Sequence, residues 1–155
     1  MGSQYMQLLS YVPFEKQSQH TPVNSSNWRR QMDTPRKMVL VVEDKASLTQ
    51  MLQFLFLSRG LDVQIAFNGE EALEKARELH PDLILLDIMM PKMDGFEVLE
   101  RLKGSDDTLE IPVIMLTARK SRDDMRKAMD LGAVEYITKP FKAVEVVDKV
   151  LRHVG

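Results

Sequence analysis

The sequence predicts an α/β fold in which five helices cover a mostly parallel, doubly wound sheet of five strands. Two observations support this prediction. Short apolar runs recur along the chain from residue 38 onward, and stretches with apolar residues at helical spacing separate them. The 155-residue chain contains no cysteine, which excludes a disulfide scaffold and any cysteine-containing metal or redox site.

Five segments have the composition of strands. Four are continuous apolar runs, as expected of strands that are buried on both faces of a parallel sheet. They cover residues 38–42, 83–86, 113–116 and 136–138. Residues 63–66 instead alternate between apolar and polar side chains, so we expect this strand to lie at an edge.

One helix is predicted after each strand. Asn68 with Glu71, and Ser121 with Asp124, have the spacing of N-terminal capping pairs, and Gly60 is placed to end the first helix. The predicted apolar stripes are Leu48, Met51, Leu52 and Leu55 in the first helix; Ala72, Leu73, Ala76 and Leu79 in the second; Val98, Leu99 and Leu102 in the third; Met125, Ala128, Met129 and Leu131 in the fourth; and Val144, Val147 and Leu151 in the fifth.

Composition divides the chain at about residue 37. Residues 1–37 are polar with scattered aromatic side chains, and we expect a flexible extension or a segment that docks on its own domain or on a second copy. Residues 38–155 are expected to form one domain. The formal net charge of −2 argues against direct nucleic-acid binding. No apolar run approaches the roughly 18–20 residues that span a bilayer, so we expect a cytoplasmic protein without a membrane partner.

Complementary polar residues follow the predicted buried strands. Glu43 and Asp44 follow the first, Asp87 the next buried run, Thr117 the third and Lys139 the last. Because sites in open parallel sheets form beyond the carboxyl ends of the strands, we expect these groups to converge. Three neighbouring carboxylates repel one another, and an all-oxygen ligand set suits Mg²⁺.

These groups are sufficient for phosphoryl transfer, with Asp87 as the best candidate nucleophile. Lys139 and Thr117 are suited to contact phosphoryl oxygens. A purely structural alternative exists for each residue taken alone. Asp44 could serve only as a helix cap, and Lys139 could be a solvated lysine before a turn.

The motifs resemble those of the receiver domain of two-component response regulators, the family that includes the chemotaxis regulators. They are the Glu43-Asp44 pair, Asp87-Ile-Met-Met-Pro-Lys-Met-Asp-Gly95, Leu116-Thr117-Ala118 and Tyr136-Ile-Thr-Lys139-Pro140-Phe141. The similarity covers about residues 38–154, and the Asp-x-Met-Met-Pro-x-Met-Asp-Gly string is highly specific. The resemblance implies a flavodoxin-like receiver fold with strand order 2-1-3-4-5.

The resemblance also assigns roles. Asp87 would accept a phosphoryl group from a phosphohistidine of a histidine kinase or phosphotransfer protein. Thr117 and Lys139 would contact that group, and the Lys139–Pro140 peptide would be cis. The implied Mg²⁺ ligands are Glu43, Asp44, Asp87 and the backbone carbonyl of Met89.

Two further roles concern signalling and lifetime. The resemblance implies that Thr117 moves toward the phosphoryl group and that Tyr136 turns inward, which changes the face formed by the fourth helix, fifth strand and fifth helix. This face would bind a downstream protein or a second copy of the chain. We expect Met89 and Arg119 to hinder the attacking water, so that the acyl phosphate is moderately long-lived.

The resulting prediction is a stand-alone response regulator that is not an enzyme, although it would catalyse its own phosphorylation and dephosphorylation. Three rival interpretations are weaker. A flavodoxin-like mononucleotide binder would need a phosphate loop where Glu43-Asp44-Lys45 stands. A haloacid-dehalogenase-like phosphatase would need a second Asp at Met89. A phosphorylation-independent scaffold would be expected to lack some of the five site residues.

Overall fold

The computed structural model describes residues 35–155 and shows a five-stranded parallel sheet in the order β2-β1-β3-β4-β5. The predicted fold class and strand order are therefore confirmed. The strands are β1 (Met38–Val42), β2 (Asp62–Ala66), β3 (Leu83–Leu86), β4 (Val113–Thr117) and β5 (Glu135–Thr138). The helices that alternate with them are α4 (Ala46–Leu57), α5 (Gly69–Leu79), α6 (Gly95–Lys103), α7 (Arg122–Asp130) and α8 (Ala143–His153).

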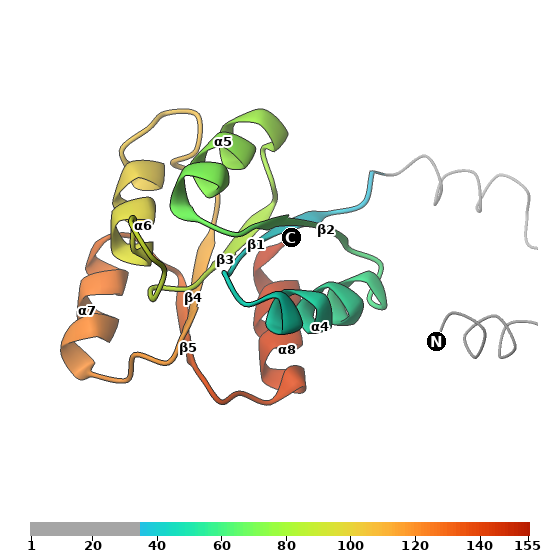
Figure 1. Cartoon of the computed structure of the whole chain (residues 1–155). Helices are drawn as coiled ribbons and strands as arrows, with labels where there is room; N and C mark the ends of the chain where they lie inside the picture. Colours follow the sequence, from blue (N-terminus) through green and yellow to red (C-terminus); the bar gives the residue numbers. More distant parts are fainter. Residues whose placement is uncertain (1–34) are drawn as a thin grey trace, which may run out of the picture. The chain divides into compact units, whose positions relative to one another are not determined.

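The sheet is covered on both faces (Figure 1), with α5, α6 and α7 on one side and α4 and α8 on the other. Each face has its own apolar core. One core joins Leu40, Ile84 and Met115 of the sheet to α5, α6 and α7. The other joins Val41 and Leu85 to α4 and α8. Burial of both faces explains why the central strands are continuous apolar runs.

The strand order creates the place for a site. The chain passes from β1 to the edge strand β2, and returns across β1 to β3, β4 and β5. All pairings are parallel, so the carboxyl ends of β1, β3, β4 and β5 lie at the same edge of the sheet. Residues that follow these strands are brought together there.

Both predicted capping pairs are present. The Asn68 side chain accepts a hydrogen bond from the backbone N–H of Glu71 at 2.8 Å, and the Ser121 hydroxyl accepts one from Asp124 at 3.0 Å. Gly60 does not end α4 directly. The helix ends at Leu57, and Gly60 follows in the left-handed region at φ +80°.

Parts of four apolar stripes were predicted wrongly. Met51, Met129, Val144 and Leu151 are exposed, and Leu79 is exposed at 39%. The core positions include Phe56 in α4 and Val146 and Val150 in α8. Helices α4 and α8 carry more apolar residues than one stripe needs, so spacing alone permits two phases there. The residue at which each helix begins selects the phase that meets the sheet.

The extension predicted for residues 1–37 lies, up to residue 34, outside the described residues. Pro35, Arg36 and Lys37 are exposed and precede β1 without regular structure. None of the five helices in the described part of the chain combines the length and apolar character needed to cross a lipid bilayer.

Candidate functional site

Three carboxylates gather at the carboxyl edge of the sheet. Glu43 and Asp44 follow β1, Asp87 follows β3, and one oxygen of each lies within 4.8 Å of the others. Glu43 and Asp87 are buried, with 2% and 4% of their surface exposed, whereas Asp44 is exposed. The predicted convergence is therefore present, with one side of the cluster open to water.

Lys139 connects the two buried carboxylates. Its ammonium lies 2.8 Å from Glu43 Oε2 and 3.2 Å from Asp87 Oδ2. The backbone N–H of Lys139 also donates to the backbone carbonyl of Thr117 at 2.8 Å. This bond attaches the end of β5 to the end of β4. The peptide bond between Lys139 and Pro140 is cis. Lys139 is thus an ion-pair partner within the site and not a solvated lysine.

Burial and charge pairing together shift the pKa values of Glu43 and Lys139. Burial, together with the nearby charge of Asp87, raises the pKa of Glu43 to about 7, even though Lys139 opposes the shift. Burial lowers the pKa of Lys139, but its hydrogen bond to Glu43 and the charge of Asp87 outweigh that effect and raise the pKa overall. Lys139 therefore stays an ammonium at neutral pH.

The backbone holds the loops of the site close to the sheet. The N–H of Glu43 donates to Ala66 on β2, and the N–H of Asp87 donates to Val42 on β1. Gly95 begins α6 against the loop after β3. A Cβ at this position would meet the Asp87 carbonyl oxygen at 2.3 Å, so only glycine allows this approach.

The carboxylates present fit a magnesium ion. Mg²⁺ prefers oxygen ligands and retains several waters, and the cluster supplies two buried carboxylates and an exposed one. Asp44 is free to serve this purpose, since Lys45 is the N-cap of α4 and no side-chain capping bond is present. The backbone N–H of Met89 donates to Asp87 Oδ1 at 3.1 Å; the role of the Met89 carbonyl stays a prediction.

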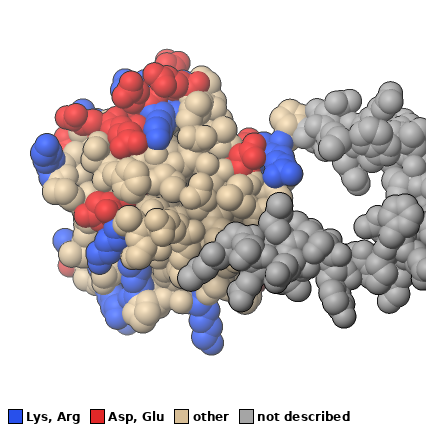
Figure 2. Space-filling model, turned by 45° about the vertical axis from the view of Figure 1, so that its right-hand side comes forward, with Lys and Arg blue, Asp and Glu red and all other residues tan. Residues whose placement is uncertain are grey.

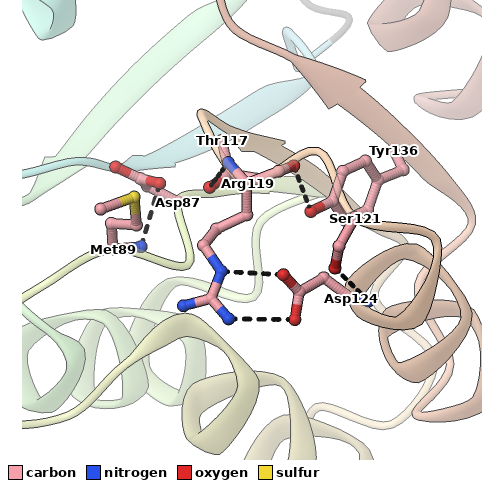
Figure 3. A network of polar contacts seen from close by, with 7 residues as sticks. All are labelled: Asp87, Met89, Thr117, Arg119, Ser121, Asp124 and Tyr136. Carbon is pink, nitrogen blue, oxygen red and sulfur yellow. Dashed lines mark hydrogen bonds and ion pairs between the residues drawn. The ribbon is translucent and has the colours of Figure 1, made fainter.

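Thr117, Arg119 and Tyr136 form a connected group beside the carboxylates (Figure 3). The backbone N–H of Arg119 donates to the Thr117 hydroxyl oxygen at 3.3 Å, and the Tyr136 hydroxyl donates to the Arg119 carbonyl at 2.7 Å. Thr117 is fully buried, whereas Met89 is 55% exposed. The positions predicted for a switch are therefore linked through the backbone of Arg119.

Sequence reasoning missed one contact of this group. Arg119 forms a two-bond ion pair with Asp124 in the first turn of α7, at 2.8 and 3.1 Å. We expected the Arg119 side chain to lie near the phosphoryl position, but in this structure it is directed to α7. Opposite charges five residues apart across a helix start were the available signal, and such spacing is too common to be diagnostic.

The comparisons with known proteins agree with this geometry. Residues 39–151 match the response regulator receiver domain family. The DNA-binding response regulator MtrA of Mycobacterium tuberculosis is 42% identical over 119 residues, which are 77% of this chain and 51% of MtrA. The alkaline phosphatase synthesis transcriptional regulatory protein PhoP of Bacillus subtilis is 45% identical over 114 residues, 74% of this chain and 47% of PhoP. The chain thus spans about half the length of these two relatives.

Solved structures show the same fold. Chemotaxis protein CheY4 of Vibrio cholerae superimposes with a TM-score of 0.73 at 30% identity, covering 77% of this chain and 99% of CheY4. The receiver domain of the Francisella response regulator 1452 gives a TM-score of 0.72 at 32% identity, over 77% and 97% of the two chains. Strand order, site geometry and sequence similarity together show that this chain belongs to the response regulator receiver domain family.

Proposed function

We propose that this receiver accepts a phosphoryl group on Asp87 from the phosphohistidine of a histidine kinase or phosphotransfer protein, in a Mg²⁺-dependent reaction. The observation that carries the proposal is the convergence of Glu43, Asp44 and Asp87 with Lys139 at the edge of the sheet. Receiver domains are phosphoacceptor signalling domains, and this chain retains the acceptor, the acidic pair, the hydroxyl and the lysine.

The chemistry follows from the positions of the side chains. A carboxylate oxygen of Asp87 attacks phosphorus, the nitrogen–phosphorus bond breaks, and the imidazole leaves with the electron pair. No general base is needed, because a carboxylate nucleophile has no proton to lose when it attacks. Bound Mg²⁺ would supply positive charge to offset the phosphoryl oxygens. Glu43, Asp44, Asp87 and the Met89 carbonyl would hold it.

Lys139 and Thr117 would stabilise the transferred group. The Lys139 ammonium already lies 3.2 Å from Asp87 Oδ2, so a phosphoryl group on Asp87 forms within reach of it. Thr117 ends β4 next to β3, and its hydroxyl would turn from Arg119 to a phosphoryl oxygen. Attack of water on the phosphorus would later restore the carboxylate and release phosphate. In this sense the chain would catalyse its own phosphorylation and dephosphorylation.

We further propose that output passes through the face formed by α7, β5 and α8, and that the protein works in the cytoplasm. Movement of Thr117 and an inward turn of Tyr136 would change this face for a downstream protein or a second copy. Acidic and basic side chains are both present on the side shown in Figure 2, without a continuous basic surface there. The formal net charge of −2 supports protein contact over direct nucleic-acid contact.

A stand-alone regulator is our preferred form. Its support is the match to CheY4, whose structure is covered over 99% of its length. The second candidate is the receiver of a DNA-binding regulator, which the 42% identity to MtrA favours. That function would require a part corresponding to the half of MtrA outside the match.

Labelling with beryllofluoride or acetyl phosphate tests the acceptor proposal. Wild-type protein should bind beryllofluoride, or gain one phosphoryl mass from acetyl phosphate, only when Mg²⁺ is present. Asp87→Ala should show neither. Asp106→Asn, which alters an exposed acid in the loop after α6, is the matched control and should behave as wild type. A folded wild-type protein that is never labelled would indicate a phosphorylation-independent scaffold.

A further inference from the structure

Arg119 is fixed at three points in the loop between β4 and α7. Its backbone N–H contacts the Thr117 hydroxyl, its carbonyl accepts from the Tyr136 hydroxyl, and its guanidinium pairs with Asp124. Of these contacts, only the ion pair attaches the loop to a helix. The loop cannot move toward Asp87 without disturbing at least one of the three contacts.

The ion pair between Arg119 and Asp124 has shorter hydrogen bonds than the contact between the Arg119 N–H and Thr117. Nε and one terminal nitrogen of Arg119 donate to the two carboxylate oxygens of Asp124 at 2.8 and 3.1 Å, a bidentate arrangement that fixes orientation as well as distance. The Asp124 side chain is only 15% exposed. Its backbone N–H is held separately by the Ser121 hydroxyl. The contact with Thr117 is longer, at 3.3 Å, and is the easier one to exchange.

The direction of the Arg119 side chain matters for the site. Figure 3 shows the guanidinium beside Asp124, whereas the Asp87 carboxylate lies beside the backbone N–H of Met89. Hydrogen bonds from Arg119, and the contact with Ser121, lower the pKa of Asp124, so Asp124 remains charged at neutral pH. The guanidinium of Arg119 is thereby directed to α7.

We propose that Asp124 is a positioning residue. Its ion pair with Arg119 holds the β4–α7 loop in the arrangement of the unphosphorylated chain. Through the Arg119 carbonyl, the same ion pair also holds the Tyr136 hydroxyl in that arrangement. The inference rests on the proposed function, because it concerns how readily Thr117 reaches a phosphoryl group on Asp87. When Thr117 turns, Arg119 loses the acceptor of its N–H and the loop shifts. The ion pair opposes that shift.

Removing the ion pair should therefore favour the liganded arrangement. Asp124→Asn and Arg119→Gln each keep a polar side chain of similar size but abolish the pair. The pair is partly exposed on its Arg119 side and such a pair contributes modestly, so we expect the concentration of beryllofluoride at half-saturation to fall about two- to fivefold in either variant. The double variant should match the single variants, because both remove the same interaction.

Asp123→Asn is the matched control. Asp123 lies in the same first turn of α7, so its charge has the same favourable interaction with the helix N-terminus. Within residues 35–155, no hydrogen bond or ion pair of its side chain is present. If Asp124 acts through Arg119, Asp123→Asn binds beryllofluoride as wild type does. If Asp123→Asn and Asp124→Asn shift binding equally, the charge at the helix start is responsible and the proposal is wrong.

A tyrosine signal separates positioning from general stabilisation. In the 155-residue chain labelled with 3-fluorotyrosine, the ¹⁹F resonance of Tyr136 is identified by its loss in Tyr136→Phe. Without beryllofluoride, Asp124→Asn and Arg119→Gln should move this resonance in the same direction, and Asp123→Asn should not. An unmoved resonance, or additive shifts in the double variant, would overturn the proposal. This comparison decides the matter even if wild type binds no beryllofluoride, a result that would count against the proposed function alone.

Discussion

Gly95→Ala tests the closest backbone contact of the site. Gly95 begins α6 and contacts the segment that carries Asp87. A Cβ on residue 95 would lie 2.3 Å from the Asp87 carbonyl oxygen and 2.6 Å from the Ile88 Cα. The first distance is about 1 Å short of the 3.4 Å at which ordinary contact begins. The atoms it meets are backbone, so no side chain can rotate to make room.

The expected cost can be estimated from two opposing effects. Gly95 has no positive φ, so alanine fits its conformation and would by itself stabilise a helical position by about 0.5–1 kcal/mol. Overpacking against an immobile neighbour costs typically about 1–3 kcal/mol. We expect the overlap to dominate and the free energy of unfolding to fall by about 2 kcal/mol. The shift would also displace Asp87 and weaken beryllofluoride binding at least tenfold.

Urea unfolding and beryllofluoride titration measure the two effects. Gly104→Ala is the matched control, because its Cβ would meet the Glu100 carbonyl oxygen at 3.2 Å and a second atom only at 3.8 Å. Gly104 lies at the far end of α6, so its replacement should leave beryllofluoride binding unchanged. If Gly95→Ala is as stable as Gly104→Ala and binds with wild-type affinity, the close approach of α6 to Asp87 is not what positions the site.

Three further changes have defined outcomes. Phe56→Ala should lower the free energy of unfolding by about 3–5 kcal/mol, since Phe56 is fully buried; Phe54→Ala, at a 63% exposed position on the same helix, should change it by less than about 0.5 kcal/mol. Asn68→Ala should lower the free energy of unfolding by about 1 kcal/mol, because it removes the cap of α5. Urea unfolding measures all three variants. An unchanged free energy of unfolding in Asn68→Ala would contradict the capping role. The pKa of Glu43 is about 7 in the fold against 4.5 ordinarily, so the native chain keeps a proton that the unfolded chain releases. The stability of metal-free wild type, relative to Glu43→Gln, should therefore fall by roughly 2–3 kcal/mol between pH 5 and pH 8 in EDTA; a difference that rises with pH would show that burial does not control this carboxyl.

The sheet and the convergence of the site could be predicted because they depend on local patterns. A run such as residues 83–86 is apolar at every position, and only a strand covered on both faces requires that. Once the strands are parallel, their carboxyl ends share one edge. The polar residues at the ends of β1, β3, β4 and β5 must then be neighbours.

Helix faces were harder to predict, for a physical reason. Helix α8 contains Val144, Val146, Val147, Val150 and Leu151, which offer two overlapping stripes. The core takes Val146, Val147 and Val150, and leaves Val144 65% exposed. The choice depends on where β5 delivers the chain, which is a tertiary property. Periodicity cannot supply that information.

The contacts of Arg119 and Lys139 also depend on tertiary structure. Lys139 is 96 residues from Glu43 in sequence, so only the strand order brings the two together. Arg119 is five residues from Asp124, but its direction depends on how the loop after β4 turns into α7. Sequence identified both residues as functional candidates; the partner of each side chain came from the structure.

The charges of the site give a physical reason for the proposed cation. Among residues 35–155, Glu43 and Asp87 share the ammonium of Lys139 while Asp44 adds a third carboxylate, and burial already raises the pKa of Glu43 to about 7. A phosphoryl group on Asp87 would increase the negative charge further, to about −1.5 to −2 on that residue alone. Lys139 cannot neutralise this charge and that of Glu43 together. A divalent cation removes the conflict and lowers the cost of ionising Glu43. Beryllofluoride binding at pH 8 should therefore need Mg²⁺ even though the lysine is already in place, and equal binding in EDTA would contradict this account.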